Sequence, residues 1–284
     1  MSIPVPVEQE NPEGLTLVLD AAEGPLQLAI ADAKGNPLFA STINAPSRGV
    51  EVLTFMLESA LTLLEKKATD ITRIAATRGP GGFTGIRLTA STAAGLARAV
   101  SARQAGLDYM KCIARQCEPF LKTSPARTLL WVLTRARRDL VYAQAFIHDQ
   151  ENSPPVRAVT ELAVLAVSSG ETAMHLMEAA KRYNASHFLL AGSGAHENRG
   201  ILELGLAEKY NFQATFLDIL APQPTMLLRA ASEAEYTDAD IEPLYIRASD
   251  AEANLPQIAA RLGLNPDNAV KQLHALTHTT PLQG

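Results

Sequence analysis

The sequence predicts a mixed α/β protein with two domains, and three patterns support this prediction. Short apolar runs of strand length alternate with longer segments in which apolar residues recur every three or four positions. Turns that contain Gly or Pro separate these runs. The chain has 284 residues, of which 47% are hydrophobic and 19% charged, enough for two domains or one large one. We therefore expect two α/β domains with mixed sheets.

The first domain begins with three predicted strands. Residues 15–20 and 26–31 are apolar, and Glu23-Gly24-Pro25 between them is typical of a hairpin turn. Lys34-Gly35-Asn36-Pro37 marks a second turn before a third strand at 38–43. Three consecutive antiparallel strands are expected at the start of the chain.

A helix is predicted over residues 49–67. Leu53, Met56 and Ala60 recur at helical spacing and form one apolar stripe. Three further apolar residues widen this stripe: Val52, Phe55 and Leu63. A helix at the surface of a domain needs a stripe of only about 100°. The extra width indicates either a helix buried inside its own domain or one that also meets a partner.

A glycine-rich segment at 78–87 lies between a predicted strand ending near residue 76 and a predicted helix over 88–100. It contains Gly79, Gly81, Gly82 and Pro80, which favour a tight turn because Gly tolerates positive φ and Pro fixes its own. Thr84 is expected to cap the following helix, whose free N–H groups would suit an anion or a partner's backbone. A simple turn without a ligand explains the segment equally well.

The second half of the chain repeats the α/β theme. Strands are predicted at 128–133 and 141–147 around a turn at 135–139, followed by a helix at 171–183, a strand at 187–191 and a helix at 199–209. We expect a flexible tail at 1–14, a first domain at 15–108, a second, smaller domain at 109–249, and an appended tail at 250–284. Asn265-Pro266 predicts a short helix in that last segment.

The glycine-rich segment resembles a known family signature. Residues 78–87 read Arg-Gly-Pro-Gly-Gly-Phe-Thr-Gly-Ile-Arg, which is similar to the R-G-P-G-S-F-T-G-V/I-R of the TsaB (YeaZ) family, with Gly82 where that family usually has Ser. Residues 17–22 resemble its opening strand, 192–195 its later glycine turn, and 242–247 its E-P-x-Y-L/I-R motif. The resemblance covers about residues 15–250.

This resemblance implies an actin/Hsp70/sugar-kinase-like (ASKHA) fold and a role in tRNA modification. It suggests a non-catalytic subunit that binds the paralogue TsaD and supports threonylcarbamoyl transfer to the tRNA adenosine next to the anticodon. The implied partners are TsaD and the ATPase TsaE, with a homodimer when the chain is alone and only indirect or weak tRNA contact. It implies no cofactor of the chain's own, with ATP or ADP near the partner interface, and a cytoplasmic protein.

The resemblance also implies an interface formed by the first two helices and the glycine turn, with no catalytic residues. We expect the partner interface to comprise the following residues: Val52, Leu53, Met56, Ala60, Arg78, Gly79, Pro80, Gly81, Gly82, Phe83, Thr84, Gly85, Arg87, Ala90 and Ala94. Small residues such as Ala90 and Ala94 would let a partner helix approach closely.

Metal and nucleophile chemistry receives little support. Catalytic relatives hold a metal with a His-x-x-x-His pair on a helix, and the corresponding positions here are Ala114 and Glu118. His274 and His278 have this spacing but lie in the appended tail, where we expect solvated side chains. Cys112 and Cys117 are expected to be buried free thiols. We predict no metal site.

Two charged features stay open to more than one interpretation. Asp20, at the end of the first strand, either binds Mg²⁺ through water, as in sugar kinases, or caps its own turn. Arg135, Arg137 and Arg138 either meet phosphate or an acidic partner, or are solvated turn residues. If Asp20 and the glycine turn bind phosphate, the alternative function is an independent ATP-binding carbamoyltransferase or kinase-like enzyme. The net charge of −5 argues against a general nucleic-acid binder.

Overall fold

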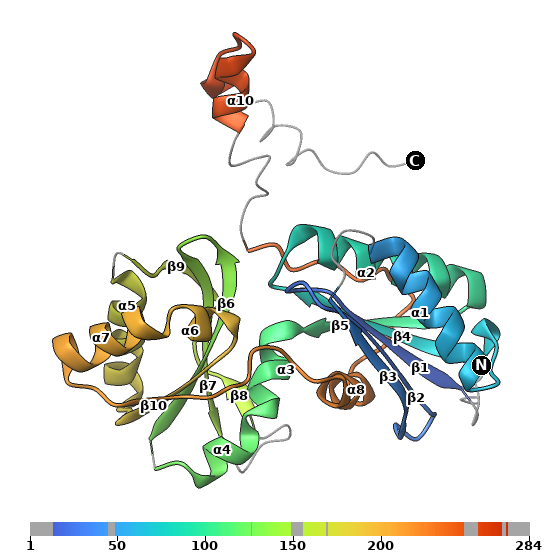
Figure 1. Cartoon of the computed structure of the whole chain (residues 1–284), viewed down its shortest axis with the longest axis horizontal. Coiled ribbons are helices and arrows are strands. Elements are labelled where there is room, and N and C mark those ends of the chain that lie inside the picture. Colours follow the sequence, from blue (N-terminus) through green and yellow to red (C-terminus); the bar gives the residue numbers. More distant parts are fainter. Residues whose placement is uncertain are drawn as a thin grey trace, which may run out of the picture. The chain divides into compact units, whose positions relative to one another are not determined.

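The computed structural model describes residues 14–44, 49–125, 127–148, 156–168, 170–246, 255–268 and 271. The chain divides into two compact units, 1–244 and 245–284. The first unit contains two β-sheets with helices on their faces (Figure 1). The described part of the second contains helix α10 (Leu255–Arg261). Of the helix predicted from Asn265, residues 266–268 and 271 are described and are helical. His274 and His278 lie outside the described residues.

The first sheet has the strand order β3-β2-β1-β4-β5. Its strands are β1 (Leu15–Asp20), β2 (Leu26–Ala31), β3 (Pro37–Ile43), β4 (Ile71–Gly79) and β5 (Arg103–Asp108). The first three are antiparallel neighbours, whereas β4 runs parallel to β1 and β5 parallel to β4. The three opening strands are confirmed almost to the residue, and β5 was not predicted.

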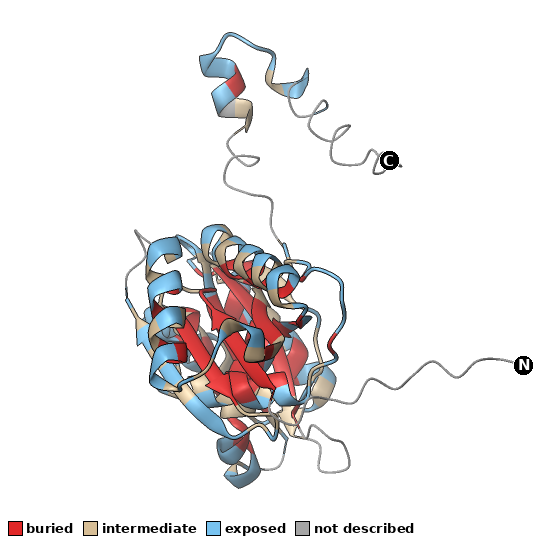
Figure 2. Ribbon diagram, turned by 90° about the vertical axis from the view of Figure 1, so that its right-hand side faces the viewer, coloured by how far each residue is buried: buried red, intermediate tan, exposed pale blue. Residues whose placement is uncertain are grey.

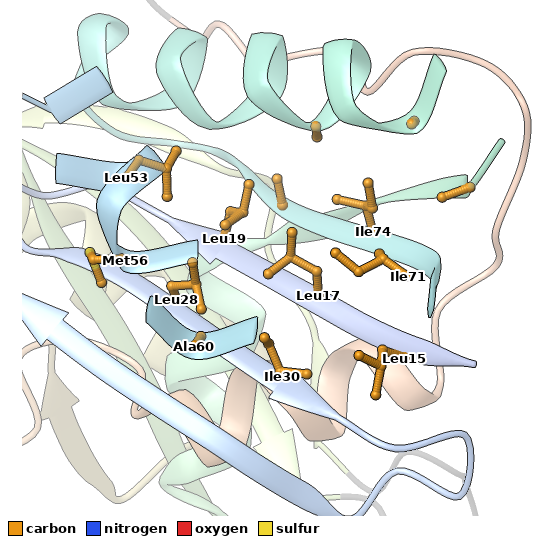
Figure 3. Close-up of a cluster of buried hydrophobic side chains, with 14 of the residues drawn as sticks. Leu15, Leu17, Leu19, Leu28, Ile30, Leu53, Met56, Ala60, Ile71 and Ile74 are labelled. Carbon is orange, nitrogen blue, oxygen red and sulfur yellow. The ribbon is translucent and has the colours of Figure 1, made fainter. Parts of the chain in front are cut away.

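Helices cover both faces of this sheet. Figure 3 shows Leu15, Leu17 and Leu19 of β1 on the face that α1 (Gly49–Leu63) and α2 (Phe83–Val100) cover. Val18 points to the opposite face and packs with α3 (Tyr109–Gln116) and α8 (Pro224–Ser232). This alternation follows from the two-residue period of a strand. Figure 2 shows the strands largely buried and the outer sides of the helices exposed.

Two helix ends differ from the sequence-based prediction. Helix α1 ends at Leu63 rather than at residue 67, because Glu65 adopts a φ of 54° and the Lys66 N–H turns back to the Leu61 carbonyl. Helix α2 begins at Phe83 with Gly82 as its N-cap. Thr84 therefore lies inside the first turn, and its prediction as the cap is wrong. A short 3₁₀ helix, η2 (Ala68–Asp70), leads into β4.

The second sheet has the order β11-β10-β6-β7-β8, with β9 also paired to β7. Its strands are β6 (Thr128–Arg137), β7 (Leu140–His148), β8 (Val156–Ala158), β9 (Ala163–Ala166), β10 (His187–Ala191) and β11 (Ala214–Phe216). Strands β6 and β7 extend further than predicted, so the turn between them shrinks to residues 138–139 and Arg135 and Arg137 lie in β6.

One face of the second sheet packs on α5 (Glu171–Tyr183), α6 (Ser193–Glu197) and α7 (Arg199–Tyr210). Helix α3 and helix α4 (Glu118–Thr123) contact strands of the same sheet. Helix α5, strand β10 and helix α7 match their predicted ranges, whereas β8, β9, β11, α6 and α8 were not predicted. The short elements escape detection because three to five residues carry little periodicity.

The chain returns to the first sheet after completing the second. Leu227, Leu228 and Ala231 of α8 pack with Val18 and Ala105, and Gln104 of β5 forms a backbone bridge with Thr237. Residues 224–237 are predicted to belong to the second domain at 109–249, but they pack against the first sheet. The tail unit begins at Tyr245. With two mixed sheets that each open with antiparallel strands, the predicted actin/Hsp70/sugar-kinase-like fold class is confirmed.

Candidate functional site at the glycine turn

The glycine turn packs backbone to backbone against the turn between β1 and β2. The Gly82 N–H donates a hydrogen bond to the Ala22 carbonyl at 2.7 Å. A Cβ added at Gly81 would lie 2.4 Å from the Ala22 carbonyl oxygen, and one added at Gly85 would lie 1.8 Å from that of Ala21. These glycines therefore allow the chain's own first turn to approach. The expectation is an anion or a partner's backbone at this turn, and the backbone that the structure places there belongs to the chain itself.

The late Glu-Pro-Leu motif lies on the other side of the same turn. The Leu244 N–H donates to the Arg78 carbonyl at 2.7 Å, and the Leu244 carbonyl lies 3.1 Å from where a Cβ would stand on Gly79, whose φ is 115°. The Arg78 side chain pairs with Asp108 at 2.7 Å. The two most specific sequence motifs are thus neighbours in space, and Arg247 lies outside the described residues.

Asp20 is buried at the end of β1, and its carboxylate accepts three hydrogen bonds. The donors are the Thr77 hydroxyl at 2.5 Å, the Ala22 N–H at 3.1 Å and the Gln27 side-chain amide at 3.1 Å. Burial raises the pKa of Asp20, and the three hydrogen bonds act in the opposite direction. These contacts favour the interpretation that Asp20 caps its own turn over the interpretation that it binds a metal.

Glu23 is a functional candidate that sequence reasoning treated only as a turn residue. Its carboxylate accepts hydrogen bonds from the Ser193 hydroxyl at 2.6 Å, the Arg135 N–H at 2.9 Å and the Tyr109 hydroxyl at 3.2 Å. Burial raises the pKa of Glu23 to about 7, against the effect of these three donors. No sequence signal identifies it, because its partners are 86 to 170 residues away in the chain.

A pocket of about 520 Å³ opens beside these two turns. Its walls come from the β1–β2 turn, the first residues of α1, the first turn of α2 and the Arg135–Ala136 segment of β6. Most of the lining is apolar, with Leu26, Val50 and Leu88 as its larger side chains, and Glu23 and Arg135 supply its ionisable groups. The pocket therefore lies between the β1–β2 turn of the first sheet and the end of β6 in the second sheet.

The predicted interface residues divide into buried and accessible groups. Leu53, Met56, Ala60 and Ala90 are buried in the core of their own chain, so their assignment to a partner surface is wrong for this structure. They point inward because α1 and α2 use those positions to cover the first sheet. Gly79 and Pro80 are also buried.

The remaining predicted interface residues keep some exposure: Val52, Arg78, Gly81, Gly82, Phe83, Thr84, Gly85, Arg87 and Ala94. Sequence reasoning omitted the most exposed apolar side chains of α1, which are Phe55 at 68% and Leu63 at 73% exposure. These two belonged to the widened stripe, and only burial data separate them from the inward residues.

The other chemical candidates have structural roles. Ala114 is buried in α3, and the Glu118 carboxylate pairs with Lys122 at 2.6 Å and Arg229 at 3.8 Å. Burial raises the pKa of the Cys112 and Cys117 thiols to about 12, which makes them poor nucleophiles. Within the described ranges, no three His, Cys, Asp or Glu side chains are grouped to hold a metal ion.

The three arginines near the end of β6 have different environments. The Arg135 side chain lies 3.6 Å from Glu197, while its N–H contacts Glu23 and Ser193. Arg137 and Arg138 are exposed at the β6–β7 turn. Ser193 stands opposite the β1–β2 turn and donates a hydrogen bond to Glu23.

Two solved structures share the fold of this chain. A crystal structure of an uncharacterized protein with similarity to peptidase YeaZ from Pseudomonas aeruginosa aligns with a TM-score of 0.60 and 21% identity, covering 82% of this chain and 100% of that one. YeaZ from Pseudomonas aeruginosa aligns with a TM-score of 0.59 and 20% identity, over 82% and 100% of the two chains.

A family comparison points to the same group of proteins. Residues 45–153 match the family described as TsaD, tRNA N6-adenosine threonylcarbamoyltransferase. The matched region contains α1, the glycine turn and α2. The resemblance to the TsaB (YeaZ) family that the motifs indicated extends to the fold, which is shared along the whole length of the YeaZ structures.

Proposed function

We propose that this chain is a non-catalytic, TsaB-type subunit that binds a TsaD protein and supports threonylcarbamoyl transfer to tRNA adenosine. The proposal draws on the TsaD-family match at residues 45–153 and on the fold shared with YeaZ. The observation that carries it is an exposed apolar stripe on α1, beside a helix whose exposed residues include Gly95 and Ala99.

This stripe has the properties of a partner surface. Val52, Phe55 and Leu63 follow one another at helical spacing along one side of α1. Phe55 and Leu63 leave most of their side-chain surface in water, although the same helix buries Leu53 and Met56 against the sheet. Two large apolar side chains aligned on one helix face are typical of a helix that docks on a partner.

Helix α2 contributes a surface that another helix can approach closely. Gly95 is exposed, and a Cβ placed on it would meet nothing within 4 Å. Ala94 and Ala99 on the same helix also keep part of their surface exposed. Small residues reduce the distance between two packed helices. The pair α1 and α2 is therefore the surface we assign to TsaD.

The role we assign to the chain is not catalytic. The positions that hold metal in catalytic relatives carry Ala114, which is buried, and Glu118, which is committed to Lys122 and Arg229. The oxygens of Asp20 are likewise engaged by donors of the same chain. The chemistry would then reside in the TsaD partner.

The same proposal covers the remaining partners. TsaE would join the pair, ATP or ADP would bind near the subunit junction and not as this chain's own cofactor, and tRNA contact would be indirect or weak. The chain would form a homodimer when alone and act in the cytoplasm. None of the helices in the described ranges is long and apolar enough to span a membrane.

Binding between the purified chain and the TsaD protein of the same source tests the proposal. Phe55→Glu and Leu63→Glu should each weaken binding about 10- to 100-fold, because burying one large apolar side chain contributes about 1.5–3 kcal/mol. Leu204→Glu on α7 is the matched control, since Leu204 is also an exposed leucine, 56% accessible, on a helix of the second sheet. It should leave affinity unchanged.

A transfer assay with threonylcarbamoyl-adenylate and tRNA completes the test. Product should require both proteins and should fall with Phe55→Glu in proportion to lost binding. Turnover by this chain without TsaD would refute the non-catalytic role. Full binding by both α1 variants would refute the assigned surface.

A further inference from the structure

One side chain connects the first sheet to two separate segments of the second. Glu23 lies in the β1–β2 turn, and its Oε1 accepts hydrogen bonds from the Ser193 hydroxyl and the Arg135 N–H, at 2.6 and 2.9 Å. Ser193 begins α6, and Arg135 lies near the end of β6. The Ser193 oxygen also accepts the Arg135 N–H at 3.0 Å, so these three groups form a closed triangle.

The other oxygen of Glu23 contacts the helix between the two sheets. Its Oε2 accepts a hydrogen bond from the Tyr109 hydroxyl at 3.2 Å. Tyr109 is the first residue of α3, which packs against strands of both sheets. One carboxyl group therefore holds together the β1–β2 turn, α3, β6 and α6.

The charges around Glu23 disfavour its ionised form. Asp20, the last residue of β1, is a second carboxyl group nearby and acts to raise the pKa of Glu23. The guanidinium of Arg135 is paired with Glu197, and in the described ranges no ion pair involves Glu23. Tyr109 and Ser193 are neutral. Glu23 is partly exposed and lines the pocket. A carboxylate partly withdrawn from water with no cation beside it is disfavoured, so the protonated acid fits this environment better.

We propose that Glu23 is a proton-operated clasp that closes the two sheets on each other when protonated and releases them when ionised. The protonated acid keeps one oxygen as an acceptor for Ser193 and Arg135, and its hydroxyl can donate to the oxygen of Tyr109. Ionisation favours a separated state in which the carboxylate is hydrated. This clasp is independent of the proposed role in tRNA modification.

The direction of the pH effect follows from proton linkage. The pKa of Glu23 is raised by burial from 4.5 to about 7 in the closed form, so the closed form binds the proton more tightly. Raising the pH from 4.5 through 7 therefore shifts the equilibrium toward the open form, by at most about 300-fold. Opening separates Glu23 and Gly24 from Arg135 and Ala136 and so widens the pocket that they line.

Distance measurement between the two sheets tests the clasp. Spin labels are placed on Thr69→Cys, beside the first sheet, and on Glu208→Cys in α7, both exposed. The native cysteines do not compete, because burial raises the pKa of both thiols to about 12. Between pH 5 and 9, the fraction of long distances should rise through neutrality.

Three variants separate the clasp from general pH effects. Glu23→Gln mimics the protonated acid and should stay closed at every pH, whereas Glu23→Ala should be open at every pH. Glu178→Gln, which removes an exposed carboxylate on α5, should behave as wild type. A pH-independent distance in the wild type overturns the proposal, and so does an unchanged pH response in Glu23→Gln.

The titration of the carboxyl group itself gives a second measurement of the same linkage. In the full chain with ¹³C-labelled glutamate, the Glu23 signal, assigned through Glu23→Gln, should titrate clearly above pH 4.5 and below the closed-form value of about 7, because opening lowers the midpoint. A midpoint near 4.5 overturns the proposal.

Discussion

The two sheets have the same strand order, but they use it to build different surfaces. Read from the edge strand of its antiparallel half, the first sheet has the order β3-β2-β1-β4-β5 and the second has the order β8-β7-β6-β10-β11. In both, an antiparallel opening is followed by two parallel strands. The same topology therefore occurs twice in one chain.

The glycine turns show how closely the repeat extends. Gly85 follows β4 and meets the turn after β1, and Gly194 follows β10 and meets the residues near the end of β6. A Cβ on Gly194 would lie 3.0 Å from the Thr134 carbonyl oxygen, compared with 1.8 Å from that of Ala21 for Gly85. Both turns need glycine for the same reason, a close backbone contact, and the contact in the first sheet is tighter.

The cores differ more than the turns. The fully buried members of the first core are aliphatic, whereas the second core contains Trp131 and Phe188, whose rings meet edge to face at 6.4 Å. In the first sheet, alanines of α2 such as Ala93 and Ala97 pack on the strands, and Phe55 remains outside. The second core thus contains aromatic rings, whereas Phe55 of α1 beside the first sheet remains exposed.

Gly85→Ala should produce the largest effect in this comparison. Its Cβ would collide with a backbone carbonyl that cannot move without disrupting the β1–β2 turn, so we expect about 5 kcal/mol of destabilisation, enough to unfold many domains. Thermal and urea unfolding would measure it. Gly95→Ala, in the open part of the same helix, should instead stabilise by about 0.5–1 kcal/mol. Equal effects of the two changes would show that the turn relaxes.

Trp131→Ala should rank second, at about 3–5 kcal/mol, because it empties the centre of the second core. Trp131→Phe is the control that keeps a ring. Trp131→Phe should lower the free energy of unfolding clearly less than Trp131→Ala, since the indole N–H has no hydrogen-bond partner in the described part of the chain. Urea titration of both variants measures the difference, and a larger loss for Phe than for Ala would contradict this account.

Enlarging the alanines of α2 sharpens the distinction between core and surface. Ala90→Leu, Ala93→Leu and Ala97→Leu should each destabilise the isolated chain by about 1–3 kcal/mol, because these positions are buried against the sheet. Ala94→Leu should preserve the melting temperature and weaken only TsaD binding. If Ala94→Leu unfolds the chain as much as Ala93→Leu does, the outward assignment of Ala94 is wrong.

Asp108→Asn should have the smallest effect, about 1 kcal/mol at neutral pH. Burial acts to raise the pKa of Asp108, but hydrogen bonds and charge from Lys111 and Arg78 outweigh it, so the net shift is downward. Because the pKa of Asp108 is lower in the folded state than its ordinary value of 3.8, the ionised group stabilises the fold above pH 3.8. This contribution is lost as the pH falls through the folded-state pKa. The difference between wild type and variant in chemical denaturation should therefore shrink below pH 3.8.

The sequence by itself determined the elements that are long or strongly patterned. Strands β1 and β2 are continuous apolar runs between turn residues, and α5 and α7 have clear helical spacing, so local chemistry sufficed for all four. The glycine motif was likewise visible, because its residue types are rare in that density. The resemblance that it carried named the fold class, which composition alone could not do.

Only the tertiary structure decided which side of each helix is used and what each turn contacts. Val52, Leu53, Phe55 and Met56 are all apolar, and nothing in their spacing shows that Phe55 is exposed while Leu53 and Met56 are buried. Glu23 is an ordinary turn residue until Tyr109, Arg135 and Ser193 come together around it. The physical reason is the same in both cases: burial and hydrogen bonding are set by segments far apart in the chain, and local periodicity carries no record of them.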